Sequence, residues 1–224
     1  MSDVHSNLEA LEAVSDEFKN FPIYCAGDVV GYGANPKEVI QWFIKRNVNT
    51  VLGNHDYAIT QNDTKWFNDK AGVSIKWTFN NLNSNEIKYL KSLQLSKIVK
   101  INELKMLIVH GSPEDKLFEY VHQYTHEHLF EGYLKQNKVD IILMGHTHIP
   151  FIWEGKNGMI INPGSVGQPR SGDNKANYVL LELTNKKIKK ASIKKVSYDI
   201  ETAAKKIKAA GLPVIFAKRL FTGI

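Results

Sequence analysis

Short apolar runs recur along the chain, each followed directly by small and polar residues. These runs are rich in β-branched and aliphatic residues and comprise Phe21–Ala26, Thr50–Leu52, Met106–Val109 and Ile141–Met144. Continuous apolarity over so few residues predicts strands buried on both faces, as in a parallel or mixed sheet covered by helices. The carboxyl ends of such strands converge at one edge of a sheet, so segments far apart in the sequence can build one site there.

Two amphipathic patterns predict helices that cover these strands. In the first, the hydroxyl of Ser6 is in place to cap a helix and Glu9 to complete a capping box. Four apolar residues then fall on one helical face: Leu8, Leu11, Val14 and Phe18. In the second, Asn35 is the predicted N-cap and Pro36 the first helical residue. Its predicted buried stripe consists of Val39, Trp42 and Phe43.

The last third of the chain continues with strands and then with helices. The predicted strands are Met159–Ile161, Tyr178–Leu183 and Lys187–Val196, the last two joined as a hairpin across Thr184-Asn185. A helix follows from Ile200 to Ala210, Gly211-Leu212-Pro213 ends it, and a second short helix comes after. No repeat or Pro/Ser-rich linker divides the chain. We therefore expect one α/β domain over residues 1–224, with residues 200–224 as a helical cap.

Composition narrows the class of protein without identifying it. The chain has 224 residues, 43% hydrophobic and 23% charged, which is ordinary for a soluble globular protein. No apolar stretch approaches the ~20 residues of a membrane span, and the first residues do not resemble a signal peptide. The single cysteine, Cys25, excludes an internal disulfide and favours a cytoplasmic protein. Its apolar surroundings predict a core residue.

The net charge of +6 is unevenly distributed. Residues 175–219 contain 12 Lys/Arg and 3 Asp/Glu, a balance of +9, and the remainder holds 17 basic and 20 acidic residues, a balance of −3. A basic region can attract nucleic acid. However, no aromatic residues stand between these lysines to stack on bases, and the pattern is typical of a solvated strand face. Nucleic-acid binding is therefore possible but not favoured.

Polar motifs follow the apolar runs in a fixed order. They are Asp3-Val4-His5, Gly27-Asp28, Gly53-Asn54-His55-Asp56, Val109-His110-Gly111 and Gly145-His146-Thr147-His148. Acidic, amide and imidazole side chains together are the mixture that holds two adjacent transition-metal ions. Each histidine could instead be a hydrogen-bonded structural residue. That alternative would have to hold independently at each strand end, which favours a metal site.

These motifs resemble those of the calcineurin-like metallophosphoesterase family, in the order Asp-x-His, Gly-Asp, Gly-Asn-His-Asp, His and Gly-His-x-His. The segment Asn162–Arg170 is also similar to the small prokaryotic phosphodiesterase branch. The resemblance covers residues 3–170 and implies a four-layer α/β/β/α sandwich with two metals at the sheet edge. It implies one metal held by Asp3, His5, Asp28 and His148. The second would be held by Asp28, Asn54, His110 and His146, with Asp28 bridging.

Hydrolysis of a phosphodiester is the activity that this set predicts. Two divalent cations activate a bridging water as hydroxide, which attacks phosphorus in line with the leaving oxygen. His55, next to Asn54, is the candidate general acid for the departing alkoxide. Arg170 is a candidate phosphate contact, although a surface arginine in this loop is an equal alternative. The ligand types accept Mn, Fe, Co, Ni or Zn.

The residues after Gly27-Asp28 bear on the substrate. Protein phosphatases of this family continue with Val-Asp-Arg-Gly, whereas this chain continues with Val29-Val30-Gly31-Tyr32-Gly33. The missing carboxylate and arginine favour a diester, with one negative charge, in a small or nucleotide-like substrate. They also leave open what orients His55. Alternatives are a phosphomonoesterase, a dinucleoside polyphosphate hydrolase, or a non-catalytic scaffold on the same fold.

Two further features carry expectations. Asp3 should end a central strand, yet only two residues precede it, so we expect the first strand to be truncated. A histidine-rich stretch could form a third metal site through His122, His126 and His128. We favour a partly exposed lid helix there, with His122 and His126 four residues apart on one face. Oligomeric state is left open by the sequence.

Overall fold

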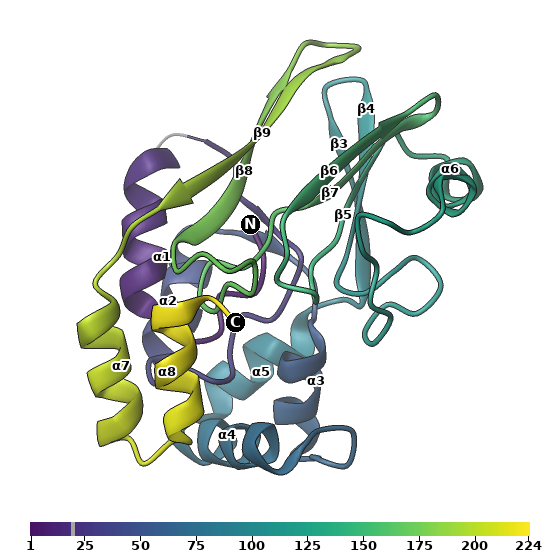
Figure 1. Ribbon diagram of the computed structural model, residues 1–224. Helices are drawn as coiled ribbons and strands as arrows, with labels where there is room; N and C mark the ends of the chain where they lie inside the picture. The colour runs from purple at the N-terminus through teal and green to yellow at the C-terminus, as the bar shows by residue number, and fades with distance from the viewer. Residues whose placement is uncertain (19–20) are drawn as a thin grey trace.

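The computed structural model describes residues 1–18 and 21–224 and has two layers of strands with helices outside them (Figure 1). The strands are β1 (Tyr24–Cys25), β2 (Asn49–Thr50), β3 (Ser96–Ile101), β4 (Leu104–Val109), β5 (Ile141–Leu143), β6 (Phe151–Gly155), β7 (Gly158–Asn162), β8 (Ala176–Leu183) and β9 (Ile188–Val196). The helices are α1 (Leu8–Ser15), α2 (Pro36–Lys45), α3 (Asn54–Gln61), α4 (Asp69–Asn81), α5 (Ser84–Ser92), α6 (Glu127–Asn137), α7 (Ile200–Ala209) and α8 (Val214–Thr222). One 3₁₀ turn spans Asp16–Phe18.

One layer is a mixed sheet in the order β3-β4-β5-β7-β6. Its inner strands β4, β5 and β7 are parallel, and its edge strands β3 and β6 pair antiparallel. Successive residues of β4 alternate between two apolar clusters. Met106 and Ile108 pack toward the second strand layer, whereas Leu107 and Val109 pack toward Phe130 of α6. A strand buried on both faces is what the continuous apolar runs predict.

The other layer contains the parallel pair β1-β2 and the antiparallel hairpin β8-β9. Residues 1–3 lie between them. The amide of Asp3 donates to the carbonyl of Gly27, and the amide of Gly167 donates to the carbonyl of Asp3, both at 3.0 Å. Asp3 therefore occupies the central position that its motif predicts, bonded on both sides. The predicted truncation of the first strand stays a prediction.

Helices complete two outer layers. Residues of α1 and α2, including Leu11, Val39 and Phe43, pack against the strand layer that contains β1. Helix α6 packs on β6 and β7 at the opposite side, as Figure 1 shows. The order of layers is α/β/β/α, which agrees with the predicted sandwich. Among the described residues, no helix is both long enough and apolar enough to span a bilayer.

The start of α1 differs from the prediction. The N-cap is Asn7, whose side chain accepts a hydrogen bond from the amide of Ala10 at 3.1 Å, and not Ser6. The hydroxyl of Ser6 instead accepts from the amide of Gly31 at 3.1 Å. Ser6 also has φ of 55°, and a cap residue normally has extended backbone. The side chain of Phe18, the last residue of the predicted face, lies outside the described residues.

The second predicted helix is confirmed as α2, with Pro36 at its first position and Asn35 as N-cap. The side chain of Asn35 makes no capping hydrogen bond. Val39 and Phe43 are buried, and Trp42 is half-buried. Near the C-terminus, α7 and α8 match the two predicted helices and are separated at residues 211–213.

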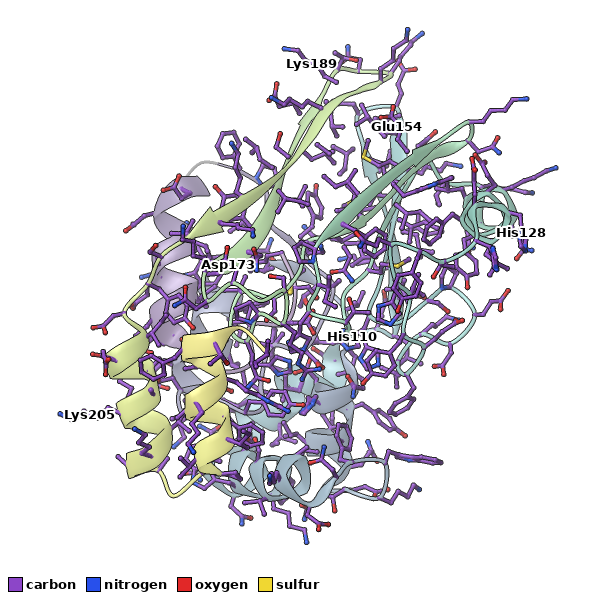
Figure 2. All side chains as sticks on the ribbon, viewed as in Figure 1. His110, His128, Glu154, Asp173, Lys189 and Lys205 are labelled. Carbon is purple, nitrogen blue, oxygen red and sulfur yellow. The ribbon has the colours of Figure 1, made fainter. Side chains whose placement is uncertain are left out.

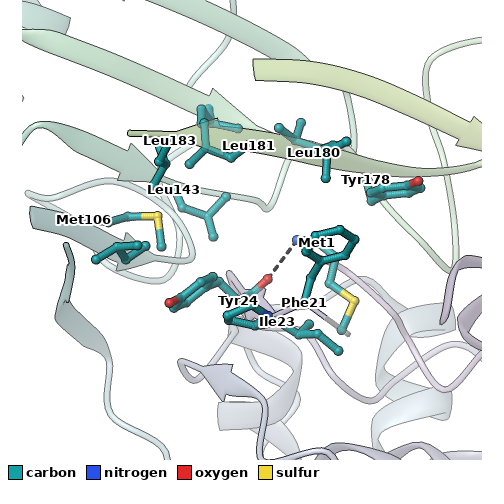
Figure 3. Close-up of a pocket in the computed structure, with 14 residues that line it drawn as sticks. Met1, Phe21, Ile23, Tyr24, Met106, Leu143, Tyr178, Leu180, Leu181 and Leu183 are labelled. Atoms are coloured by element: carbon teal, nitrogen blue, oxygen red, sulfur yellow. Dashed lines mark hydrogen bonds between the residues drawn. The ribbon is translucent and has the colours of Figure 1, made fainter. Parts of the chain in front are cut away.

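An apolar cavity of about 270 Å³ lies between the strand layers, next to the first residue (Figure 3). Its walls include Met1, Tyr24, Met106, Leu143 and Leu181. The α-ammonium group of Met1 is buried there and donates to the carbonyl of Tyr24 at 2.8 Å. Burial lowers the pKa of this ammonium group. The cavity offers hydrocarbon walls and none of the predicted metal ligands, so the chemistry lies elsewhere.

Candidate metal centre

The seven predicted metal ligands lie in loops or in a first helical turn, and five of them follow strands, whereas Asp3 and His5 precede α1. Asp28 follows β1, Asn54 opens α3 after β2, and His110 follows β4. His146 and His148 follow β5. Each of the seven side chains belongs to a residue that is at most 6% exposed. Figure 2 shows His110 in the interior of the molecule, below the strands.

Five of these ligands have a left-handed backbone conformation. The φ angles are 54° at Asp3, 48° at His5, 52° at Asp28, 68° at His146 and 60° at His148. This region is uncommon for residues with a Cβ and costs roughly 1–3 kcal/mol at each position. Sharp turns of this kind let the backbone leave a strand while the side chain points back over its end. Their concentration at one place is typical of functional sites.

Backbone carbonyl groups orient three of the imidazoles through Nδ1. The contacts are His5 to Val30 at 3.2 Å, His110 to Ala26 at 2.8 Å, and His148 to Gln168 at 2.5 Å. A carbonyl oxygen can only accept, so each Nδ1 carries the proton. Nε2 of each ring then faces the centre, where it can offer a lone pair to a metal. Metal-binding histidines are commonly held in this way.

The first group of ligand atoms consists of acceptors that face one another. Nε2 of His5 lies 3.1 Å from Nε2 of His148, which lies 3.3 Å from Oδ1 of Asp3. Oδ1 of Asp3 is buried and has no hydrogen-bond partner in the part of the chain that the structure describes. Lone pairs this close repel unless a cation lies among them. Two ligands about 2.1 Å from one ion are roughly 3.0–3.5 Å apart. The arrangement therefore fits a metal ion.

The second group surrounds Nε2 of His110. Oδ1 of Asn54 lies 2.8 Å from this nitrogen, and Oδ2 of Asp28 lies 3.4 Å from it. The same Asp28 oxygen is 3.5 Å from Nε2 of His5, so it faces both groups. Ligand atoms lie within 4.8 Å of one another in two sets, Asp3-His5-His148 and Asp3-Asp28-His110. Asp3 thus belongs to both sets, in addition to Asp28, which the motif pattern assigns as the bridge.

His146 stands apart from these two sets. Its backbone amide donates to Oδ2 of Asp3 at 3.2 Å, and Nε2 of its ring donates to the carbonyl of Phe118 at 3.2 Å. The neutral ring therefore keeps its lone pair on Nδ1. Burial, followed by the charge of His110, lowers the pKa of His146 to about 3. The ring is neutral at physiological pH, with Nδ1 as the nitrogen able to bind a metal.

Electrostatics at the centre also favour cations. Burial raises the pKa of Asp28 well above its usual value, and the nearby carboxylates of Asp56 and Asp3 raise it further. Burial opposes ionisation of Asp3 too, but the surrounding imidazoles outweigh this and hold its pKa low. Burial also lowers the pKa of His5. Neutral imidazoles and crowded carboxylates present lone pairs whose mutual repulsion metal ions relieve.

Aromatic packing orients His55, a point that the sequence leaves open. Its ring lies 4.3 Å from that of Tyr32, 4.8 Å from that of Phe67 and 4.9 Å from that of His5, measured between centroids. Among the described residues, Nδ1 of His55 is buried and has no hydrogen-bond partner, so no carboxylate holds this nitrogen. Packing on Tyr32 and Phe67 fixes the ring instead. Tyr32 follows Asp28 closely in the sequence, but neither aromatic residue has a motif that identifies it.

Asp56, the last residue of its motif, binds backbone amides and is not one of the predicted metal ligands. Its carboxylate accepts from the amides of Val29, Val30 and Gly53 at 3.0–3.1 Å. It thereby ties the loop after Asp28 to the start of α3. Gly53 permits this contact, because a Cβ there would lie 2.0 Å from Oδ1 of Asp28. A glycine at this position is therefore required by the close approach of two loops.

A pocket of about 430 Å³ opens beside these residues. Its lining comprises Asp28, Tyr32, Asn54, His55, Trp66, Phe67, Asn68, Ala71, Phe118, Tyr120, His146, His148, Arg170 and Arg219. Arg170, a predicted substrate contact, lies within it. The guanidinium NH2 group of Arg170 is 3.5 Å from the hydroxyl of Tyr32, and its Nε is buried without a partner. Arg219, on α8, is a lining residue that the sequence did not indicate.

The predicted lid helix is wrong. Residues 111–126 form a loop, and α6 begins only at Glu127. His122 lies in this loop, with its ring stacked between those of Tyr120 and Tyr124. His128, in contrast, lies on α6 at the outer face (Figure 2). No set of metal-binding groups within the described residues includes these histidines.

Comparisons with known proteins agree with this geometry. The model of the calcineurin-like phosphoesterase superfamily domain matches residues 1–186. An uncharacterized protein of Methanocaldococcus jannaschii is 38% identical over 244 aligned positions, which cover 100% of this chain and 96% of that protein. A phosphodiesterase of the same organism is 27% identical over 168 positions, covering 73% of this chain and 80% of the relative.

A solved structure supports the same relationship. The crystal structure of a metallophosphoesterase from Sphaerobacter thermophilus superposes with a TM-score of 0.85 at 29% identity, covering 100% of this chain and 98% of the other. The family match extends over all seven predicted metal ligands. The fold, the buried acceptor groups and these similarities agree, and the chain belongs to the calcineurin-like phosphoesterase superfamily.

Proposed function

We propose that this protein is a metal-dependent phosphodiesterase that hydrolyses small or nucleotide-like substrates. The observation that supports this most is the set of buried acceptors without protons between them. Nε2 of His5, Nε2 of His148 and Oδ1 of Asp3 lie within about one ligand-to-ligand spacing of each other. Such a cluster is unfavourable unless cations bind to it. The relative named as a phosphodiesterase supports the same class of reaction.

Seven residues are the proposed ligands. Asp3, His5, Asp28 and His148 would hold one divalent ion, and Asp28, Asn54, His110 and His146 the other. When bound, two such ions supply an activated water and neutralise charge on the phosphate oxygens. Mn, Fe, Co, Ni and Zn all suit these ligands.

Two further side chains act on the substrate in this proposal. Arg170 donates to a phosphate oxygen, because it lines the pocket beside Asp28 and its planar guanidinium group matches phosphate oxygens. His55 delivers a proton to the leaving oxygen from Nε2, since Nδ1 is enclosed by protein. Burial, with the charges of His148 and Arg170, lowers the pKa of His55 well below its usual value. An anionic phosphate beside the ring would raise this pKa and so favour the protonated, proton-donating form of His55.

Preference for a diester rests on the loop that follows Asp28. The amides of Val29 and Val30 donate to the carboxylate of Asp56, and the ring of Tyr32 packs on that of His55. This loop therefore contributes the aromatic ring of Tyr32 to the pocket and contributes no arginine. Without an arginine from the loop that follows Asp28, a single negative charge on the scissile phosphate is favoured over two.

Hydrolysis of chromogenic esters tests the proposal. Purified protein supplied with Mn²⁺ should cleave bis-p-nitrophenyl phosphate faster than p-nitrophenyl phosphate, and chelator should abolish cleavage. Asp28→Asn should lower bound metal, measured by elemental analysis, and lower the rate by roughly 100-fold or more. His128→Ala is the matched control, since it removes an exposed imidazole away from the pocket.

The outcomes separate the alternatives. Faster cleavage of the monoester would identify a phosphomonoesterase. Bound metal without any cleavage, or absence of both, would favour a scaffold and contradict the proposal. Full activity of Asp28→Asn would refute the shared ligand assignment.

A further inference from the structure

The mouth of the pocket is built from aromatic rings on two separate loops. Trp66 comes from the turn between α3 and α4, and Phe118 and Tyr120 come from the loop before α6. The rings of Trp66 and Phe118 lie 6.1 Å apart, and that of Tyr120 lies 4.0 Å from the ring of His146. Trp66 is 67% exposed and Tyr120 is 58% exposed. The exposed ring of Tyr120 therefore packs directly on His146, a proposed metal ligand.

The backbone beneath these rings is fixed. Leu117 and Val121 are buried on either side of the two loop aromatics. The carboxylate of Asp115 accepts from the amides of Leu117 and Phe118, both at 3.1 Å. The carbonyl of Phe118 accepts from the ring of His146. The rings are thus presented on an ordered surface, so little conformational entropy is lost when a flat ligand binds.

The turn that carries Trp66 is also held by hydrogen bonds. The amide of Phe67 donates to the carbonyl of Thr64 at 3.0 Å, and the amide of Lys65 donates to the carboxylate of Asp63 at 3.0 Å. The ammonium group of Lys65 lies 5.3 Å from the ring centre of Trp66 and pairs with the carboxylate of Asp63 at 3.2 Å. The exposed part of the Trp66 ring is favourable for stacking of a base.

A second guanidinium group enters the pocket from the end of the chain. Arg219 and Phe216 are three residues apart on α8 and so share a face. The ring of Phe216 packs on that of Tyr32, with centroids 4.7 Å apart, which places α8 over the pocket. In the described part of the chain, neither Arg170 nor Arg219 pairs with a carboxylate. Residue 219 also lies beyond the region that the family model matches.

We propose that the substrate is a nucleotide with a phosphate in addition to the scissile diester. Its base stacks on Trp66 and Tyr120 at the mouth, and Arg219 binds the additional phosphate. Base stacking is tolerant of sequence because every base has a π-face, and a planar guanidinium matches phosphate oxygens. This inference rests on the proposed diesterase activity for the reaction itself, and it adds the class of substrate.

Three esters with the same leaving group test the specificity. They are ethyl p-nitrophenyl phosphate, thymidine 5′-(p-nitrophenyl phosphate) and the 3′-phosphate of that thymidine ester. We expect kcat/KM to rise from the first to the third. Trp66→Ala should reduce the preference for the thymidine ester over the ethyl ester by roughly 5–100-fold, the loss of one stacking contact. Arg219→Gln should remove the gain from the 3′-phosphate.

Matched variants control for general damage. Tyr124→Ala removes an exposed ring that does not line the pocket, and Lys218→Gln removes the cation next to Arg219 in the sequence. Both should retain the wild-type order of the three esters. An unchanged preference in Trp66→Ala and Arg219→Gln would overturn the inference.

Binding separates this inference from the proposed activity. By calorimetry, thymidine 3′,5′-bisphosphate should bind the Mn²⁺-supplied protein at least tenfold more tightly than 2-deoxyribose 5-phosphate. Trp66→Ala should weaken binding of the bisphosphate about tenfold. If the bisphosphate binds this way but none of the esters is cleaved, the diesterase proposal fails and the nucleotide site stands. If the bisphosphate binds no better than the sugar phosphate, the nucleotide site is refuted whether or not the ethyl ester is cleaved.

Discussion

At the residue scale, the site depends on which atom of each side chain faces inward. Nδ1 of three histidines donates a hydrogen bond to a backbone carbonyl, that of Val30, Ala26 or Gln168. The ligand types were predictable, because imidazole and carboxylate groups follow the apolar runs. The tautomers were not, since the carbonyl groups that set them come from other segments. His55 shows the same division: its motif identified it, but only packing on Tyr32 and Phe67 explains its orientation.

Leaving-group dependence tests the role of His55. His55→Ala should keep its metal content but slow diesters with alkoxide leaving groups by about 10²–10⁴-fold. Esters of p-nitrophenol should lose much less, because p-nitrophenolate departs without a proton. Rates for a series of leaving groups, with metal measured in the same samples, check this. An equal loss across the series would exclude proton delivery by His55.

The reactivity of Cys25 is a second residue-scale prediction. Burial raises the pKa of the Cys25 thiol to about 12, so very little thiolate exists at pH 8. We expect iodoacetamide to leave the folded protein unmodified at that pH and to modify it rapidly in concentrated urea. Mass spectrometry of the intact protein reads out both. Rapid modification without denaturant would show that the residue is not in the core.

At the element scale, the residues and hydrogen bonds near each helix start explain which helices were predicted correctly. Pro36 after Asn35 is a strong start signal, and α2 begins there. The lid helix failed because its side chains compete with helical hydrogen bonds. In the predicted stretch, the hydroxyl of Thr125 accepts from the amide of His122 at 3.2 Å, and the amide of Thr125 donates to the carbonyl of His122 at 3.0 Å. Side chains of this kind stabilise turns at the expense of helix. At α1 a tertiary contact moved the N-cap from the predicted Ser6 to Asn7, because the hydroxyl of Ser6 accepts from the amide of Gly31 instead.

The two asparagine caps provide a matched test. Asn7→Ala should lower the free energy of unfolding by about 1–2 kcal/mol, because its side chain both caps α1 and donates to the carbonyl of Gly167. Asn35→Ala should cost roughly 0.5 kcal/mol or less, because that side chain makes no capping bond. Urea unfolding monitored by circular dichroism measures both. Equal losses would contradict the cap assignment.

At the scale of the whole molecule, the layers bring the site together. Ladder bonds place Asp3 between Gly27 and Gly167, and β5 carries His146 and His148 to the same end. Helix α8 packs through Phe216 on Tyr32 and so belongs to the surroundings of the pocket, and α7 packs against α8. We propose that residues 1–224 fold as one domain that includes this helical cap.

Thermal unfolding tests both the single domain and metal binding. We expect one transition, with the same midpoint for secondary structure and for aromatic packing. Mn²⁺ at 100 times its Kd should add about 2.7 kcal/mol and raise Tm by roughly 5–10 °C. Asp28→Asn should lose this shift. Two separated transitions would contradict the single domain, and an equal shift in the variant would contradict the ligand assignment.

The sequence by itself determined the family motifs, their order along the chain and the buried strands that most of them follow, and from these the proposed ligand set was predicted. These features follow from local pattern, because each motif after the first directly follows an apolar run. Only the tertiary structure decided which side chains surround the ligands. Trp66, Tyr32 and Arg219 come from a turn, a loop and the last helix, and none has a motif of its own. Their place depends on how α4, α6 and α8 pack against the strand ends, and long-range packing of that kind leaves no local pattern in the chain.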